Sequence, residues 1–183
     1  MSLPASDLVS RNWAREGPDR LWVAHITFVP TREGWLYLAF VLDAYSRRVV
    51  GWAMAGHIRA ELVVDALTLA VSRRNPTSDL VHHCDHGRQY TSIEFGSALG
   101  EAGILPTMGS IGSPHDNAMA ESFVATLKTE LLDRRPWHTR DAARGAVFEY
   151  VECFYNPLRR HSALGYLSPI EYERSMMTSA TAA

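Results

Sequence analysis

Two long apolar runs near the start of the chain predict strands at the centre of a sheet. The runs are Leu21–Val29 and Trp35–Leu42, and a strand that is apolar on both faces is typical of a sheet covered on both sides. A third strand is predicted at Arg47–Ala55. The connections at Pro30–Gly34 and Asp43–Ser46 are short and rich in turn-forming residues. The pattern therefore predicts three antiparallel strands joined as a meander.

The hydrophobic period then changes to that of helices. In Ala60–Arg74 apolar residues stand at 62, 63, 66, 67 and 70, which is the spacing of one helix face. A short strand is predicted at Leu80–Cys84, a helix at Ser92–Ala102 and another strand at Ile104–Met108. Because strands that alternate with helices usually run parallel, we expect two parallel strands beside the meander.

The stretch 109–128 begins with glycine, serine and proline and continues as a helix. Asp116 or Asn117 is placed to cap this helix, because their side-chain oxygens accept hydrogen bonds from its first free N–H groups. Glu121 and Lys128 fall on one face of the helix. They lie away from a broad apolar side made of Ala120, Phe123, Val124, Leu127 and Leu131.

The C-terminal part is predicted to be helical with one long connection. Thr139–Tyr155 is an amphipathic helix capped by Thr139, residues 156–168 form a basic connector, and Pro169 opens a short last helix. We expect a cloning scar with a linker, one core domain and a disordered tail, at residues 1–18, 19–176 and 177–183.

Composition favours a single globular domain without a membrane span. The chain has 183 residues, 46% of them hydrophobic. No apolar run reaches the roughly 18 residues that a spanning helix needs, and no signal peptide is recognisable. Cys84 and Cys153 show neither a disulfide framework nor metal-type spacing. We therefore expect two reduced thiols in a cytoplasmic protein.

Charge alone gives no reason to expect a nucleic-acid partner. The net charge is −2, and Lys128 is the only lysine. The arginines come in pairs, which more often lie on a solvated face than in a binding patch: Arg47-Arg48, Arg73-Arg74, Arg134-Arg135 and Arg159-Arg160.

Three motifs in a fixed order carry a resemblance to a known family. An apolar strand ends on Asp85, 35 residues separate this acid from Glu121, and Lys128 follows seven positions later. The segments HHCDHGRQYTS, GSPHDNAMAESFVATLKTE and YNPLRRHSALGYLSP occur in that order. In these features the chain resembles the catalytic core of DDE transposases and retroviral integrases, especially that of bacterial insertion-sequence transposases. The resemblance covers roughly Asp19 to Arg174.

The resemblance implies a fold and a reaction. The implied fold is α/β and ribonuclease-H-like, with a five-stranded mixed sheet (three antiparallel strands and two parallel) flanked by helices. The implied reaction is metal-dependent DNA strand transfer on transposon ends and target DNA by a homo-oligomer, which is nucleoid-associated when bound to DNA. In this family a helix-turn-helix region that recognises the ends precedes the core, and nothing in this sequence matches it.

The resemblance also implies roles for individual residues. Strand transfer in the family uses two Mg²⁺ or Mn²⁺ ions held by carboxylates. Asp85 and Glu121 match two of these ligands, and His25 stands at the third position. Lys128 is expected to meet a phosphate near the scissile bond, and the loop 110–115 is expected to be among the most mobile internal segments without DNA. Further candidate DNA contacts are Asn117, Arg159, Arg160 and His115. For His115 the alternative is an exposed side chain without a role in binding.

The first-strand position departs from the family pattern. That pattern reads Trp-Val-Ala-Asp-Ile-Thr, whereas this chain reads WVAHIT from Trp22 to Thr27, with His25 in the place of Asp. One imidazole lone pair binds one ion and cannot bridge two, and it suits Mn²⁺ or Zn²⁺ better than Mg²⁺. We therefore expect impaired strand transfer. The alternative is a catalytically inactive module that binds DNA or regulates a sister transposase.

Asp43 is a poor substitute for the absent acid. With the turn centred between Arg32 and Glu33, Phe40 lies opposite His25, and Asp43 stands three residues further along. This offset is about 10 Å, and the odd number turns the side chain to the other face of the sheet. Asp43 is better interpreted as a turn-forming acid.

The run His82, His83, Cys84, Asp85 and His86 suggests a zinc site as a weaker alternative. Alternate side chains of a strand point to opposite faces, so positions 82, 84 and 86 do not converge with 83 and 85. No second cluster in the sequence supplies further ligands.

Overall fold

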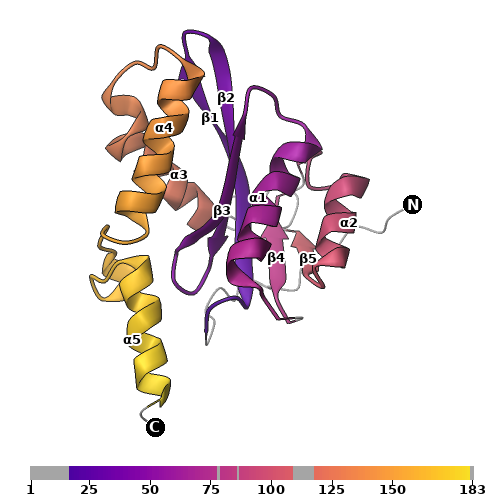
Figure 1. The fold of residues 1–183 in the computed structure, drawn as a ribbon, viewed down its shortest axis with the longest axis vertical. Helices are drawn as coiled ribbons and strands as arrows, with labels where there is room; N and C mark the ends of the chain where they lie inside the picture. The colour runs from indigo at the N-terminus through magenta and orange to yellow at the C-terminus, as the bar shows by residue number, and fades with distance from the viewer. Residues whose placement is uncertain (1–16, 78, 86, 109–117, 182–183) are drawn as a thin grey trace.

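The computed structural model describes residues 17–77, 79–85, 87–108 and 118–181. These residues form a five-stranded sheet with helices on both faces (Figure 1). The strand order is β3-β2-β1-β4-β5. Strands β1, β2 and β3 are antiparallel, while β4 and β5 run parallel to β1, which confirms the predicted ribonuclease-H-like fold. The strands are β1 (Leu21–Thr31), β2 (Gly34–Asp43), β3 (Val49–Ala55), β4 (Val81–Cys84) and β5 (Leu105–Met108).

The hairpin of β1 and β2 has the register that its turn predicts. Residues 32–33 form a tight turn. His25 lies opposite Phe40, and Trp22 lies opposite Asp43. Asp43 is therefore three residues beyond the position opposite His25, as expected.

Helices cover the two faces of the sheet and divide the core into two clusters. In Figure 1, α1 (Ala60–Arg74) and α2 (Ile93–Glu101) lie on one side, and α3 (Ala118–Glu130) and α4 (Arg140–Glu149) lie on the other. Helix α5 (Pro169–Thr181) continues past residue 176, where the predicted core ends. In the described part of the chain, no helix is long and apolar enough to cross a membrane. The short helices are η1 (Leu132–Arg134) and η3 (Ser162–Leu164).

The predicted helix Thr139–Tyr155 changes its geometry part-way. The Thr139 side chain caps α4 as expected, accepting a hydrogen bond from the Ala142 N–H at 3.1 Å. After Glu149 the chain continues as a π-helical segment, η2 (Tyr150–Tyr155). Such segments are rare and often occur near functional sites.

The close approach of α1 to β3 depends on Gly51. A Cβ atom at this position would lie 2.3 Å from the Ala66 carbonyl oxygen and 2.6 Å from the Ala70 Cβ. Any larger residue would push α1 away from the sheet.

A network of charged side chains joins the C-terminal helix to one corner of the sheet. Arg74, at the end of α1, contacts Asp19 through Nε and Nη2, each at 2.8 Å, and Glu173 of α5 through Nη1 at 2.9 Å. Ser46 and Arg48 also bind the Glu173 carboxylate, at 2.8 and 2.7 Å. The Arg74 and Glu173 side chains are only 12% and 8% exposed, so this ion pair is nearly withdrawn from water.

Asp43 closes the turn beside this network. Its Oδ1 accepts hydrogen bonds from the Tyr45 and Ser46 N–H groups at 3.0 and 2.9 Å, and its Oδ2 accepts one from the Asp19 N–H at 2.7 Å. Burial raises the pKa of Asp43 to about 6. These contacts agree with the interpretation of Asp43 as a turn-forming acid.

His82 is buried among aromatic side chains on the α1 and α2 side of the sheet. Its ring lies edge-to-face with that of Phe95, with 5.3 Å between centroids. Neither ring nitrogen has a hydrogen-bond partner among the described residues. Burial, with a further contribution from His83, lowers the pKa of His82 to about 3, so the folded protein keeps this imidazole neutral.

We expect acid to destabilise the protein through His82. Below the ordinary pKa of about 6.5, the unfolded chain takes up a proton that the folded chain does not, so the free energy of unfolding falls as the pH is lowered towards about 3. At pH 5 the loss is about 2 kcal/mol. His82→Leu should remove this part of the pH dependence, as measured by urea denaturation at pH 8 and pH 5.

Asp43 acts with the opposite sign in this experiment, because its raised pKa of about 6 makes the folded state gain stability as the pH falls through that value. The difference between wild type and His82→Leu therefore isolates the histidine. An equal acid-induced loss in both proteins would assign the sensitivity to other groups.

Candidate active site

Two adjacent parallel strands bring His25 and Asp85 together. Strands β1 and β4 pair with Val23 beside His83, and His25 and Asp85 continue this alignment two residues further on. Nδ1 of His25 lies 3.8 Å from Oδ2 of Asp85, and the side chains are 24% and 47% exposed. Both groups are therefore open to a ligand.

Asp85 is held by a turn that directly follows β4. The Gly87 N–H donates a hydrogen bond to Oδ1 of Asp85 at 2.9 Å, which is an Asx-type turn. A Cβ atom on residue 87 would lie 2.9 Å from the same oxygen, so a larger residue here would displace the carboxylate. The turn holds Oδ1 of Asp85 in place, and the other oxygen, Oδ2, faces His25.

His25 is predominantly neutral at pH 7. Burial lowers its pKa, and Lys128 acts in the same direction, whereas the charges of Asp85 and Glu121 raise it without reversing the effect. The ring also lies edge-on to Phe40, with 6.2 Å between centroids. The pair with Asp85 is therefore a contact between a carboxylate and a neutral imidazole.

Helix α3 carries Glu121 and Lys128 beside this pair. Glu121 is exposed in the first turn, and its charge acts on His25. Nζ of Lys128 lies 5.4 Å from the centroid of the Phe28 ring, within the range of a cation–π contact. The helix is anchored by its buried side chains, Ala120, Phe123 and Leu127.

The described residues do not form a ready-made metal centre. Among them, no group of three or more His, Cys, Asp or Glu side chains is arranged to hold a metal ion. His82 and His83 are each 1% exposed, and Cys84 is 2% exposed. Three residues of the suggested zinc cluster are thus buried, with His82 packed in the aromatic core. Asp85 is instead exposed beside His25, and His86 lies outside the described residues.

The predicted DNA contacts differ in their surroundings. Arg159 binds Glu130 through two nitrogens, Nε at 2.9 Å and Nη2 at 2.7 Å. Arg160 is exposed and forms no ion pair with any residue that the structure describes. His115 and Asn117 lie outside the described residues, as do the loop 110–115 and the candidate cap Asp116.

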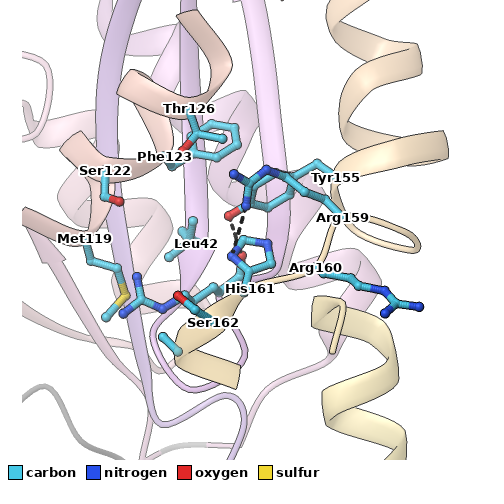
Figure 2. Close-up of a pocket in the computed structure, with 12 residues that line it drawn as sticks. Leu42, Met119, Ser122, Phe123, Thr126, Tyr155, Arg159, Arg160, His161 and Ser162 are labelled. Atoms are coloured by element: carbon cyan, nitrogen blue, oxygen red, sulfur yellow. Dashed lines mark hydrogen bonds between the residues drawn. The ribbon is translucent and has the colours of Figure 1, made fainter. Parts of the chain in front are cut away.

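Sequence reasoning missed a polar pocket on the other flank of α3. Arg47, Arg159, Arg160 and His161 line it, together with hydroxyl side chains (Figure 2). These residues lie in a turn and in a connector, where hydrophobic residues do not repeat at a helix or strand spacing that would indicate a structure. The paired arginines were the one local signal of this pocket.

Comparisons with known proteins support an integrase-type core. A family model described as "Integrase core domain" matches residues 15–114, and a second model with the same description matches residues 102–169. The transposase for insertion sequence element IS904 of Lactococcus lactis is 39% identical over 173 residues, 94% of this chain and 68% of that protein. The transposase InsF for insertion sequence IS3A of Escherichia coli is 40% identical over 172 residues, 93% of this chain. The chain spans 60% of the length of InsF.

A solved structure gives the same fold. The HTLV-2 integrase catalytic core domain, in complex with magnesium in its trimeric form, aligns with a TM-score of 0.66 at 15% sequence identity. The alignment covers 87% of this chain and 99% of the HTLV-2 chain. At this level of identity the likeness is one of fold.

Proposed function

Because the chain belongs to the integrase-core family that includes insertion-sequence transposases, we propose that it is the DNA strand-transfer core of a transposase, impaired by His25. The observation that carries the proposal is the pair of His25, on β1, and Asp85, directly after the parallel strand β4, with 3.8 Å between Nδ1 and Oδ2. Glu121 is near enough for its charge to act on His25. Transposon ends and target DNA are the substrates in this proposal.

The ligands do not fit a site for two magnesium ions. A carboxylate bridges two ions through its two oxygens, whereas neutral His25 has one lone pair to offer. The described residues also lack a preassembled group of three ligands. His25, Asp85 and Glu121 would instead hold a single divalent ion, and Mn²⁺ tolerates imidazole better than Mg²⁺ does. The magnesium in the HTLV-2 core structure supports a divalent cation as the cofactor.

The DNA would extend from this site across α3. Lys128 is the candidate contact for a phosphate near the scissile bond, with Asn117, His115 and Arg160 as further contacts. Arg159 has its charge offset by Glu130, so its contribution would be smaller. We propose a homo-oligomer as the active form, with end recognition by a helix-turn-helix region N-terminal to this core, acting at the nucleoid.

A catalytically inactive module of the same fold is the second candidate. His25 supports this candidate as well, because it replaces the bridging carboxylate of the family with an imidazole, which cannot bridge two metal ions. Such a protein would bind DNA, or a sister transposase, and regulate transposition without transferring strands.

Strand transfer of a pre-nicked transposon-end duplex distinguishes the two candidates. We expect weak activity that is about tenfold higher in Mn²⁺ than in Mg²⁺, because Mn²⁺ accepts an imidazole ligand more readily. Asp85→Asn and Glu121→Gln should abolish it, while Asp141→Asn, which removes an exposed acid of α4, should not. If DNA binds but no strand is transferred in either ion, the inactive module is the function.

A further inference from the structure

A pocket of about 250 Å³ lies between α3 and the segment that follows η2 (Figure 2). It occupies the flank of α3 that carries Ser122 and Thr126. Glu121 and Lys128 lie on a different flank, because successive helix residues are turned by about 100°. None of the described residues that line the pocket is acidic, and its donors are Arg47, Ser122, Thr126, Arg160, His161 and Ser162.

The positive charge of this pocket is only partly compensated. Arg159 is paired with Glu130 at 2.7 Å. Arg47 and Arg160 form no ion pair with any part of the chain that the structure describes. Arg47 is near enough to His161 for its charge to lower the histidine pKa, whereas Arg160 extends away from His161 at the rim (Figure 2). The walls therefore favour an anion.

Arg47 adopts a backbone conformation that arginine seldom takes. Its φ is 59°, in the left-handed region that favours glycine or asparagine. Its N–H donates to the Asp43 carbonyl at 2.8 Å, and its own carbonyl accepts a hydrogen bond from the Tyr155 hydroxyl at 3.1 Å. The backbone is thus fixed on both sides. Strain of this kind is often retained where a side chain is needed for function.

His161 carries an N–H donor that lacks an acceptor. Its Nδ1 lies 3.5 Å from Nη1 of Arg159, and because arginine only donates, Nδ1 is the acceptor and the proton resides on Nε2. Nε2 is buried without a hydrogen-bond partner among the described residues. Burial, then Arg159 and Arg47, lower the pKa of His161 to about 4, so the ring is neutral at pH 7.

We propose that this pocket holds a phosphate group of a DNA strand, bound by Arg47, His161 and the hydroxyl groups of Ser122 and Ser162. The inference rests on the proposed function, which supplies DNA as the partner. Every oxygen of a phosphate accepts hydrogen bonds, and every polar side chain of these walls donates them. Glu121 does not line the pocket and lies on another flank of α3, so this phosphate would position the DNA and take no part in the chemistry.

Arg47→Asn tests the proposal, because asparagine tolerates the left-handed backbone while the charge is lost. Binding of a fluorescein-labelled 30-base-pair duplex is followed by anisotropy at several salt concentrations, without divalent ions. We expect about tenfold weaker binding and a salt slope reduced by about 0.9, the value for one phosphate contact. Arg144→Asn, which removes an exposed arginine of α4, is the charge-matched control and should change neither quantity.

His161→Phe provides a second, independent variant. It keeps a ring against Tyr155, whose centroid lies 5.1 Å from that of His161, but removes the Nε2 donor. Binding should weaken several-fold, and the salt slope should stay unchanged because no charge is lost. Thermal unfolding checks the fold of each variant, and Arg47→Gly replaces Arg47→Asn if the latter is unfolded.

The outcomes separate this proposal from the proposed function. If wild type binds DNA and Arg47→Asn matches it in affinity and slope, the pocket is refuted and the strand-transfer core stands. If no protein of the series binds DNA, both are refuted. A titration with inorganic phosphate, followed by the NMR signals of His161, adds a third arm. Phosphate that competes with DNA supports the proposal, and phosphate that binds there without competing overturns it in favour of a small-anion site.

Discussion

His25→Asp should raise DNA strand transfer in Mg²⁺ by about 10²–10³-fold. The carboxylate would face Asp85, which now lies 3.8 Å from the imidazole, and would supply the two oxygens that a bridging ligand requires. One metal-stabilising contact of about 3–4 kcal/mol corresponds to this factor in rate. The stability of the fold should change little, because the His25 side chain is partly exposed in an open site and its exchange leaves no cavity.

The measurement is strand transfer of transposon-end DNA by a chain fused to the end-recognition region of a relative. Calorimetric titration with Mg²⁺ gives a second readout, and tighter binding is expected in the variant. His138→Asp, which places the same substitution at an exposed position before α4, is the matched control and should change neither. If the protein with His25 is already as active as His25→Asp, another residue bridges the ions.

Arg74→Met should lower the free energy of unfolding by about 3–5 kcal/mol. Burial alone would raise the pKa of Glu173, but its hydrogen bonds with Arg74, Ser46 and Arg48 hold that pKa below its ordinary value. Removing the Arg74 guanidinium leaves Asp19 without its ion pair and Glu173 with only Arg48 and Ser46, and Glu173 is nearly excluded from water. The large cost comes from a buried negative charge that keeps only part of its compensation.

Urea denaturation at pH 7.5 measures the effect, with Arg144→Met as the control. Arg144 and Asp141 are equally close, at 2.7 Å, but their side chains are 43% and 91% exposed, and exposed pairs contribute about 0–1 kcal/mol. The loss in Arg74→Met should shrink as the pH falls, because Glu173 takes up a proton more readily once the guanidinium that lowers its pKa is removed. Equal losses in the two variants at pH 7.5 would show that burial does not set the strength of the Arg74 network.

The sheet was predictable because its signals are local. The apolar runs of β1 and β2 are separated by a short turn, and the position of that turn sets which residue faces His25. Asp85 and Glu121 were found through their spacing and the family resemblance. The protonation of His25 could not be found in this way, because it depends on burial and on the charges of Asp85, Glu121 and Lys128, which come together only in the folded chain.

The parts that sequence reasoning missed depend on contacts between distant residues. Arg74 contacts Asp19 and Glu173, which lie 55 and 99 positions away along the chain. Neither separation produces a periodic pattern in the sequence. The change from α4 to η2 falls inside an uninterrupted helical pattern, where Tyr150 and Tyr155 pack into the core. Arg47 looked like one member of a solvated pair, and its left-handed backbone only becomes visible in the folded turn.

The Arg74 network also decides how the domain would respond to tension. Asp19 lies just before β1 and Glu173 lies in the last helix, and one guanidinium binds both. A pulling force between the two ends of the core would therefore act on these ion pairs before it acted on the hydrogen bonds between strands. His25 and Asp85 both lie between Asp19 and Glu173 in the chain. A force applied to the segments that flank the core should therefore reach β1 and β4 only after Arg74 has released its partners.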